Sequence, residues 1–312
     1  AGKVQWPTGT NDWVPMETIE SFETAPAYDL VVPITQTVPF ALSSPHSGTS
    51  YPRAFLEASQ LPTQDLRRSE DTYVDRLIAP AVQKGAPVVA ARFPRCYCDV
   101  NREPYELDPR MFDSPLPGFA NTASLRVAGG LGTVPRVVGD RQPIYRKKLT
   151  VKDALDRVER LYKPYHATLR RVLAQTHVRF GASVLIDCHS MPSLIRTATG
   201  TLSTDFVIGD RFGASCAPEL SEQVIASLRS LGFTVARNKP YAGGFITEHY
   251  GRPAKGIHAL QLEINRGLYM NERTLVPNNG FNAVMDALSQ TMDALFEIDL
   301  DCLAPLDQAA AE

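Results

Sequence analysis

The chain has 312 residues, 44% of them apolar, which is enough to bury a large core in one domain or in two small ones. Its 32 basic and 34 acidic residues leave a formal charge of −2, which argues against a nucleic-acid or acidic-membrane partner. No apolar run could span a membrane, the N-terminal segment lacks a signal-peptide pattern, and the five cysteines are scattered, so we expect a cytoplasmic protein with reduced thiols.

The first third of the chain predicts an arm, several strands and one helix. Residues 1–35 carry many Pro and Thr without a period and predict an irregular N-terminal arm. Beyond the arm, apolar runs predict strands at 38–44, 86–93 and 96–100, and helical spacing predicts one helix over 65–85.

The rest of the chain begins with a long irregular segment. Residues 103–145 are rich in Pro, Gly and Arg, and long loops of this kind in compact domains are often functional. A long helix follows at 151–181, in which Pro164 is the point where it could kink. Further patterns predict strands at 182–190, 205–210, 233–238 and 257–266, helices at 218–232 and 281–298, and a Gly-rich loop at 240–256.

Strands that alternate with helices predict an α/β fold with helices on both faces of the sheet. The absence of repeats and linkers favours one domain over 36–300, followed by a C-terminal tail at 301–312. Ligands bind such sheets beyond the carboxyl ends of the strands. Polar residues follow three predicted strands, namely His46, the pair Asn101–Arg102, and His189, so we expect them to converge.

Two histidines at different strand ends can hold one metal ion. A catalytic zinc commonly takes three protein ligands, from histidine and carboxylate. The "SED" of the predicted helix supplies two candidate acids, Glu70 and Asp71, which flank its apolar face equally, so periodicity does not choose between them. Both acids could instead lie at an exposed helix N-terminus, where the helix dipole stabilises a negative charge. Asp187 precedes His189 by two residues on the same strand face, where it could fix the imidazole tautomer.

The pair Asn101 and Arg102 favours anion binding, because the guanidinium fork suits a carboxylate. Arg95 lies near the same predicted edge. Either arginine could instead form a structural ion pair.

Glu263 lies inside the apolar strand "LQLEINR", where a charge is unfavourable unless it is paired or functional. A glutamate beside a metal-activated water is the usual general base of metal hydrolases. The structural alternative is an ion pair with Arg266 or Arg252.

Taken in order, six segments of the chain resemble the N-formylglutamate amidohydrolase family, over about residues 38 to 298. The segments are "SPHSG", "SEDTYVDRL", "RCYCDVNR", "IDCHSMPS", "NKPYAGGFITEHYGRP" and "ALQLEINRGLYM". The family is similar to the zinc carboxypeptidases and aspartoacylase, so the resemblance implies a mixed, mostly parallel sheet with one catalytic zinc per chain.

The resemblance also implies a role for each candidate residue. It makes His46, His189 and an acid the zinc ligands, and the "DTYVDRL" pattern favours Asp71 over Glu70 as that acid. It further implies a carboxylate clamp, an oxyanion-stabilising arginine and a general base, which are respectively Asn101 with Arg102, Arg95, and Glu263.

The implied reaction is hydrolysis of the small acidic substrate N-formyl-L-glutamate to formate and glutamate by a zinc-activated water. Two alternatives stay open. One is an amidase acting on another N-acyl amino acid or a small peptide, and the other is a non-catalytic carboxylate-binding protein on the same fold.

Overall fold

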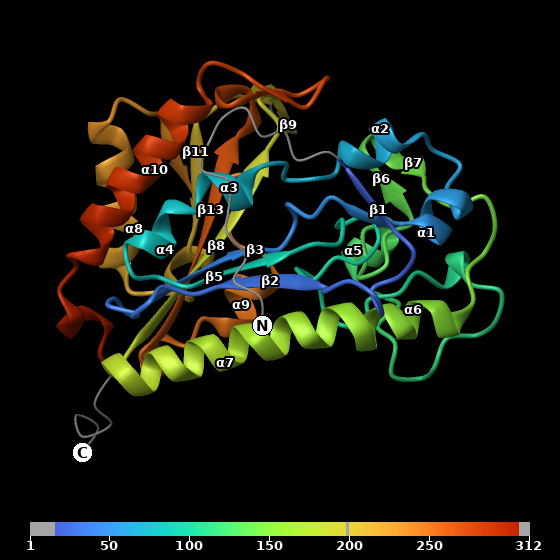
Figure 1. The fold of residues 1–312 in the computed structure, drawn as a ribbon, viewed down its shortest axis with the longest axis horizontal. Coiled ribbons are helices and arrows are strands. Elements are labelled where there is room, and N and C mark those ends of the chain that lie inside the picture. Colours follow the sequence, from blue (N-terminus) through green and yellow to red (C-terminus); the bar gives the residue numbers. More distant parts are fainter. Residues whose placement is uncertain (1–15, 198–199, 306–312) are drawn as a thin grey trace.

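A seven-stranded mixed sheet forms the centre of the computed structural model, which describes residues 16–197 and 200–305 (Figure 1). In order across the sheet the strands are β12 (Val235–Arg237), β11 (Phe206–Gly209), β13 (Ile257–Asn265), β8 (Ser183–Met191), β3 (Phe40–Ser44), β5 (Val88–Ala91) and β2 (Tyr28–Val31). The four strands from β13 to β5 run parallel. β11 pairs antiparallel with β13 and parallel with β12, and β2 pairs antiparallel with β5. The predicted α/β fold with a mixed, mostly parallel sheet is therefore confirmed.

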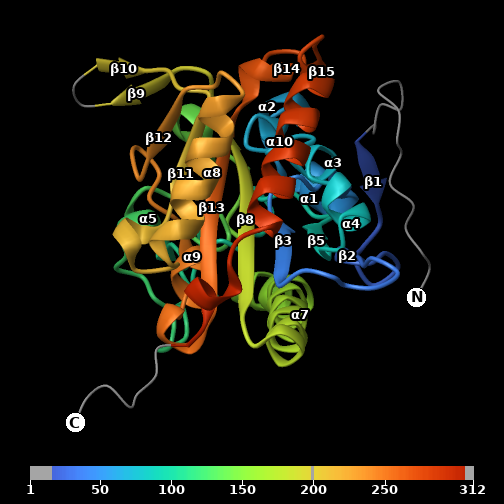
Figure 2. The ribbon, with the colours of Figure 1, turned by 90° about the vertical axis from the view of Figure 1, so that its left-hand side faces the viewer.

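Helices cover both faces of this sheet. One face packs against α7 (Lys163–Phe180) and α9 (Phe245–Tyr250), and the other against α3 (Val74–Leu77), α4 (Pro80–Gln83), α8 (Pro218–Ser230) and α10 (Phe281–Phe296). Figure 2 shows α8 and α10 side by side. In β3, Phe40 and Leu42 pack on the α8–α10 side and Ala41 on the α7 side. Strands buried on both faces are continuously apolar, which is why these runs stand out in the sequence.

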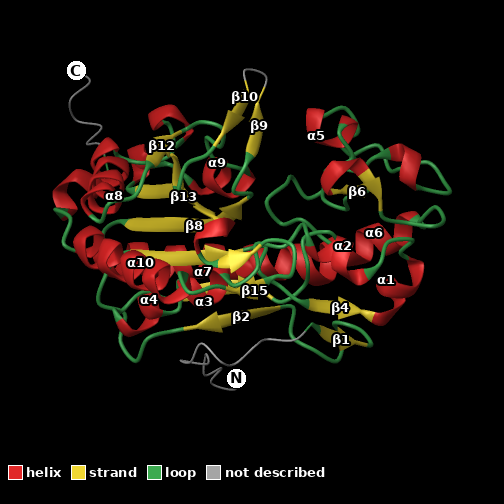
Figure 3. Ribbon diagram, turned by 90° about the horizontal axis from the view of Figure 1, so that it is seen from above, coloured by secondary structure: helices red, strands yellow, loops and turns green. Residues whose placement is uncertain are grey.

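Smaller elements gather beyond one end of the central strands, away from α8 and α10 (Figure 3). They are β1 (Glu17–Ile19), β4 (Ser50–Pro52), α1 (Arg53–Ala58), α2 (Thr63–Arg67), α5 (Leu125–Ala128), β6 (Val137–Val138), β7 (Gln142–Pro143) and α6 (Val151–Arg157). Two short hairpins, β9 (Ile195–Thr197) with β10 (Gly200–Leu202) and β14 (Met270–Asn271) with β15 (Val276–Pro277), complete the chain. No helix in the described ranges is long and apolar enough to cross a membrane.

The helix expected over 151–181 is present but irregular. One turn of π-helix, Val158–Tyr162, joins α6 to α7 without a break in the chain's path. Pro164 is the second residue of α7, so the π turn lies where its ring and its missing N–H disturb the regular helical hydrogen bonding.

The prediction of a single helix over 65–85 is wrong. The segment forms three short helices, α2, α3 and α4, and residues 69–72 between the first two are not helical. The backbone N–H of Asp71 donates to the carbonyl of His46 at 2.9 Å, and Tyr73 adopts a left-handed φ of 68°. This bond to a distant strand end overrides the local helical pattern.

Two other local expectations are also corrected. Residues 96–100 form a turn rather than a strand, because the N–H groups of Tyr97 and Cys98 donate to the carbonyl of Pro94 at 2.9 and 3.3 Å. The Gly-rich segment 240–256 contains α9, whose apolar side chains Ile246 and Tyr250 pack into the core beside α7.

The folded domain extends beyond both ends of the range 36–300 expected from the sequence. Residues 16–35 are not wholly irregular, because they contribute β1 and the sheet-edge strand β2, each too short to give a clear period. In the expected tail at 301–312, Leu303 is fully buried and its carbonyl accepts a bond from His258 Nε2 at 3.0 Å. Residues 1–15 and 306–312 lie outside the described ranges.

Candidate active site

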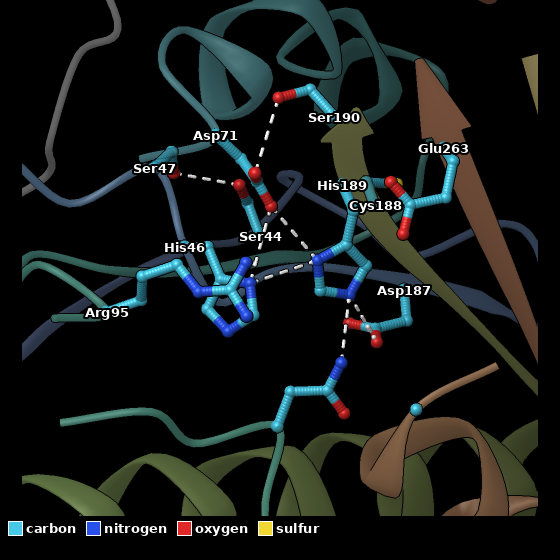
Figure 4. Close-up of polar contacts among 12 residues, drawn as sticks. Ser44, His46, Ser47, Asp71, Arg95, Asp187, Cys188, His189, Ser190 and Glu263 are labelled. Carbon is cyan, nitrogen blue, oxygen red and sulfur yellow. Dashed lines mark hydrogen bonds and ion pairs between the residues drawn. The ribbon is translucent and has the colours of Figure 1, made fainter. Parts of the chain in front are cut away.

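Three neighbouring parallel strands bring the predicted polar residues to one edge of the sheet (Figure 4). His46 follows the carboxyl end of β3, and His189 lies near the carboxyl end of β8. Glu263 on β13 is the register partner of His189. The expected convergence of polar residues beyond the strand ends is therefore present.

His46, Asp71 and His189 form a buried cluster. His189 Nδ1 lies 3.1 Å from His46 Nδ1 and 3.1 Å from Asp71 Oδ2, and His46 Nδ1 lies 3.3 Å from the same oxygen. Glu70 does not join them, since its carboxylate accepts bonds from Tyr51 and Arg67. Of the two acids left open by periodicity, the fold brings Asp71 to the histidines.

Each imidazole of the cluster is oriented by a second carboxylate. His46 Nε2 lies 2.8 Å from Asp99 Oδ1, and His189 Nε2 lies 2.8 Å from Asp187 Oδ2. Because an ionised carboxylate only accepts hydrogen bonds, each Nε2 carries the proton. Both Nδ1 atoms then present lone pairs to each other and to Asp71. Asp187 thus has the tautomer-fixing position expected for it.

Three lone-pair atoms facing one another require a cation or a proton between them. Nitrogen and oxygen ligands lie about 2.0–2.2 Å from zinc, so two ligands of a tetrahedral ion are roughly 3.3–3.5 Å apart. The separations of 3.1–3.3 Å in the cluster come close to this spacing. The three side chains therefore fit a divalent ion.

The charge distribution of the cluster also favours a cation. Burial acts to raise the pKa of Asp71, but hydrogen bonds from His189 and His46 hold it well below its ordinary value. Burial acts to lower the pKa of His189, yet the carboxylates of Asp187 and Asp71 raise it well above its ordinary value. An environment that stabilises a proton in this way also attracts a metal ion.

A further layer of contacts holds these carboxylates in place. Ser43 Oγ donates to Asp187 Oδ1 at 2.9 Å, and Tyr165 OH lies 2.9 Å from the same hydroxyl. Arg266 Nη2 donates to Asp71 Oδ1 at 2.8 Å, which leaves Oδ2 for the cluster. Such outer contacts fix the geometry of ligand side chains.

Asp99 links the cluster to the arginines. Its Oδ1 accepts from His46 and from the backbone N–H of Asn101, the latter at 2.9 Å. Its Oδ2 lies 2.9 Å from Arg95 Nη2 and 3.4 Å from Arg102 Nη2. Burial acts to raise the pKa of Asp99, but the two arginines and His46 hold it well below its ordinary range. Arg95 and Arg102 are therefore fixed relative to His46.

Asn101 and Arg102 lie beside the cluster, but much of their hydrogen bonding is internal. Asn101 Oδ1 accepts from the N–H of Ile246 at 2.8 Å; its Nδ2 lies 3.3 Å from His189 Nε2 but makes no hydrogen bond there, because that nitrogen carries its proton toward Asp187. A Cβ at Gly244 would come within 2.4 Å of that amide, so the contact requires glycine there. Arg102 donates to the carbonyls of Leu131 and Asn101 at 2.8 and 2.7 Å.

Glu263 is 7% exposed, and its Oε1 accepts from Gln261 Nε2 at 2.8 Å. Neither suggested partner pairs with it in the described structure. Arg266 donates to Asp71, while Arg252 donates to the carbonyls of residues 248 and 251. Burial raises the pKa of Glu263 to about 7, and the charge of Asp71 adds to the rise. This carboxylate is buried without an ion pair, which is typical of a functional group.

These residues line one cavity of about 570 Å³. Five arginines and three acids share its wall, so the arginines outnumber the carboxylates. The arginines are Arg68, Arg95, Arg102, Arg126 and Arg266, and the acids are Asp71, Asp99 and Glu263. Burial lowers the pKa of Arg102 to about 10, and the charges of Arg95 and Arg126 contribute. The cavity is therefore suited to a small anion.

Several residues of this cavity were not singled out as site residues in the sequence. Arg126 belongs to the aperiodic segment 103–145, and Tyr241 to the Gly-rich segment 240–256. Asp99 approaches His46 across 53 positions of the chain. The arginine-rich composition of 103–145 was the one available signal, and it does not identify a particular side chain.

Comparisons with known proteins agree with this geometry. Residues 38–270 match the sequence model of the family N-formylglutamate amidohydrolase. The N-formylglutamate deformylase of Pseudomonas putida is 33% identical over 75% of this chain and 83% of its own length, and that of Pseudomonas aeruginosa is 31% identical over 76% and 84%. The crystal structure of N-formylglutamate amidohydrolase from Ralstonia eutropha superimposes with a TM-score of 0.81 at 37% identity, covering 86% of this chain and 97% of that one.

Proposed function

Because the chain belongs to the N-formylglutamate amidohydrolase family, we propose that it hydrolyses the amide bond of N-formyl-L-glutamate to formate and glutamate. The proposal extends to this chain the activity for which its Pseudomonas relatives are named. The residues of the cavity supply each group that such a hydrolysis needs.

His46, Asp71 and His189 would hold one zinc ion, with Nδ1, Oδ2 and Nδ1 as the ligand atoms. When bound, such an ion polarises the amide carbonyl and lowers the pKa of a water toward about 7. Asp99 and Asp187 keep both imidazoles in the tautomer that leaves Nδ1 free for this purpose.

Glu263 is the proposed general base. Its carboxylate lies on the strand next to His189, is buried and carries no ion pair in the described structure. It takes a proton from the attacking water and delivers it to the leaving nitrogen, so that the C–N bond breaks with glutamate leaving as an amine. Gln261, which donates to one carboxylate oxygen, orients the other toward the cavity.

Arg95 and Arg102 are proposed to act on the two ends of the substrate. Arg95 stabilises the oxygen anion that forms when water adds to the formyl carbon, and Asp99 holds its guanidinium in place. Arg102, assisted by Asn101, binds a carboxylate of the leaving half and sets the scissile bond over the cluster. Both arginines retain N–H groups beyond those that their internal contacts use.

One observation supports this proposal above the others. The candidate ligands, the unpaired Glu263 and a surplus of arginine line the same cavity. A surplus of positive charge favours an acidic N-acyl amino acid over a neutral one. A non-catalytic carboxylate-binding protein would have no need of a buried carboxylate beside a metal site.

Release of the free amino acid from a panel of N-acyl amino acids tests the proposal. Zinc-loaded protein should act on N-formyl-L-glutamate with a higher kcat/KM than on N-acetyl-L-glutamate or N-formyl-L-leucine. A higher kcat/KM for the acetyl compound would make the protein an amidase of different acyl specificity. Carboxylate binding without turnover of any substrate would leave only a binding function.

A further inference from the structure

N-formylglutamate carries two carboxylates, and the contacts described so far assign a partner to one of them. The following inference rests on the proposed function and concerns the second carboxylate. A side-chain carboxylate buried near the scissile bond needs its own cation, because an unpaired charge in a cavity is unfavourable. The cavity offers further arginines beyond Arg95 and Arg102, so their surroundings decide which one serves.

Arg266 already uses its guanidinium for hydrogen bonds beside the metal cluster. Its guanidinium donates to Asp71 Oδ1 at 2.8 Å, to Ser190 Oγ at 2.9 Å and to the carbonyl of Arg68. The carbonyl of Arg68 therefore lies beside Arg266, whereas Asn101 approaches the cluster at His189 Nε2. Arg266 is thus held by residues of the metal cluster and not by those of the proposed carboxylate clamp.

Arg126 lies next to that clamp. Its Nη1 approaches the carbonyl oxygen of Asn101 at 3.3 Å, and Arg102 Nη1 donates to the same oxygen at 2.7 Å. Two guanidinium groups that share one acceptor atom lie side by side. They could bind two carboxylates that are separated by a short aliphatic chain, as in glutamate.

Arg126 also has donors to spare. The carbonyl of Asn101 is its one hydrogen-bond acceptor in the described structure, and no carboxylate there forms an ion pair with it. By contrast, Arg95, Arg102 and Arg266 each lie against an acid of the site. Arg126 is half-buried in the wall of the cavity, which would strengthen a pair with an incoming anion.

The fold holds Arg126 in this position firmly. It lies on α5, where Ser124 Oγ caps the helix by accepting from the N–H of Val127 at 3.1 Å. The following loop returns to the site, because the carbonyl of Thr133 accepts from the N–H of Asp99 at 2.8 Å. The segment that carries Arg126 is thus tied to the residue that orients His46.

We propose that Arg126 binds the side-chain carboxylate of the substrate, beside Arg102 at the main-chain carboxylate. The segment 103–145, which also contributes Leu131, Pro135 and Val137 to the wall, then determines the preference for an acidic side chain. The long irregular segment 103–145 thus has a specific role, which is to bind the γ-carboxylate and to exclude neutral N-formyl amino acids.

The test compares two substrates of equal shape, N-formyl-L-glutamate and N-formyl-L-glutamine, on the wild type and three variants. Arg126→Met should lower kcat/KM for the glutamate compound by at least about tenfold, the usual loss for a charged hydrogen bond. It should change kcat/KM for the glutamine compound by less than about twofold. Arg126→Lys keeps the positive charge but loses the planar guanidinium group, so it should retain part of the preference for the glutamate compound.

Arg53→Met is the control. Arg53 lies on α1, is exposed and pairs with Glu57 outside the cavity. Its loss should leave the ratio of the two kcat/KM values unchanged. An equal loss on both substrates in Arg126→Met, or no loss on either, would overturn the proposal.

Binding of the product separates this inference from the proposed function. Titration calorimetry of zinc-loaded protein should give tighter binding of L-glutamate than of L-glutamine, and Arg126→Met should abolish the difference. Wild-type protein that does not discriminate between the two overturns the role of Arg126 whatever the hydrolysis assay gives. Retained discrimination in wild type without formate release would refute the hydrolysis alone.

Discussion

Replacement of Glu263 by glutamine separates a catalytic from a structural role for this buried carboxylate. Glutamine keeps the size of the side chain and can still accept the bond from Gln261 Nε2, which is 2.8 Å long in the wild type. It cannot accept a proton from water. We therefore expect kcat for N-formyl-L-glutamate to fall by about 10²–10⁴, the usual contribution of general-base catalysis.

The same substitution should not lower the stability of the protein, although it lowers kcat. Burial and the charge of Asp71 raise the pKa of Glu263 from 4.5 to about 7. In metal-free protein, the stability associated with this group is present below pH 4.5 and is lost as the pH rises through about 7, by up to about 3 kcal/mol. At pH 8 the Glu263→Gln variant does not lose this stability, so its free energy of unfolding should equal or exceed that of the wild type.

Steady-state kinetics and urea denaturation of chelator-treated protein at pH 8 measure these two properties, and elemental analysis should show that the variant keeps its zinc. Glu248→Gln is a suitable control, since Glu248 is exposed and pairs with Arg211 away from the cluster. A structural ion pair at Glu263 forecasts the reverse pattern, with lower stability and most of the turnover retained. Near-normal kcat in Glu263→Gln would remove the residue from the mechanism.

Three further predictions concern the clamp, the metal ligands and pH. Arg102→Ala should lower kcat/KM for N-formyl-L-glutamate by at least about tenfold, and the loss should shrink for the α-amide of that substrate. Asp187→Asn should weaken zinc binding by about 10–100-fold in competition with a chelator, because His189 loses its tautomer partner. Burial lowers the pKa of His166 to about 4, so the stability present above pH 6.5 is lost as the pH falls toward 4. His166→Gln can still donate to the carbonyl of Val100. Between pH 7 and 4.5 in urea titrations, the free energy of unfolding of this variant should fall by about 2–3 kcal/mol less than that of the wild type.

Each of these predictions has a result that contradicts it. An equal loss on the acid and the α-amide would make Arg102 structural. Unchanged zinc affinity in Asp187→Asn would mean that the His189 tautomer does not depend on this carboxylate. Identical acid sensitivity of wild type and His166→Gln would mean that protonation of His166 does not drive acid unfolding.

The sequence predicts the central strands well because each is buried on both faces. In β8 the apolar run "VLI" leads into "DCHS", and β13 carries Glu263 among apolar residues. Such runs depend on local composition alone, and the parallel order of β3, β8 and β13 then brings His46, His189 and Glu263 to one edge. The convergence of His46 and His189 could therefore be inferred without coordinates, whereas the place of Glu263 beside them was implied by the family resemblance.

Contacts between distant segments determine the remaining features, and local patterns do not contain them. The bond from the Asp71 N–H to the His46 carbonyl breaks the expected helix and brings Asp71, rather than Glu70, to the cluster. The approach of Arg126 to the Asn101 carbonyl depends on the path of a segment without periodicity. Periodicity did not choose between the two acids, and only the family resemblance favoured Asp71; finding the second arginine required the fold.

The zinc content of purified variants tests the central claim most directly. After zinc loading and dialysis, the wild type and Glu70→Gln should each retain one zinc per chain by elemental analysis. Asp71→Asn and His46→Gln should retain little, because each removes one of the three converging ligand atoms. Wild-type zinc content in both Asp71→Asn and His46→Gln, or its loss in Glu70→Gln alone, would contradict the assignment of the metal centre.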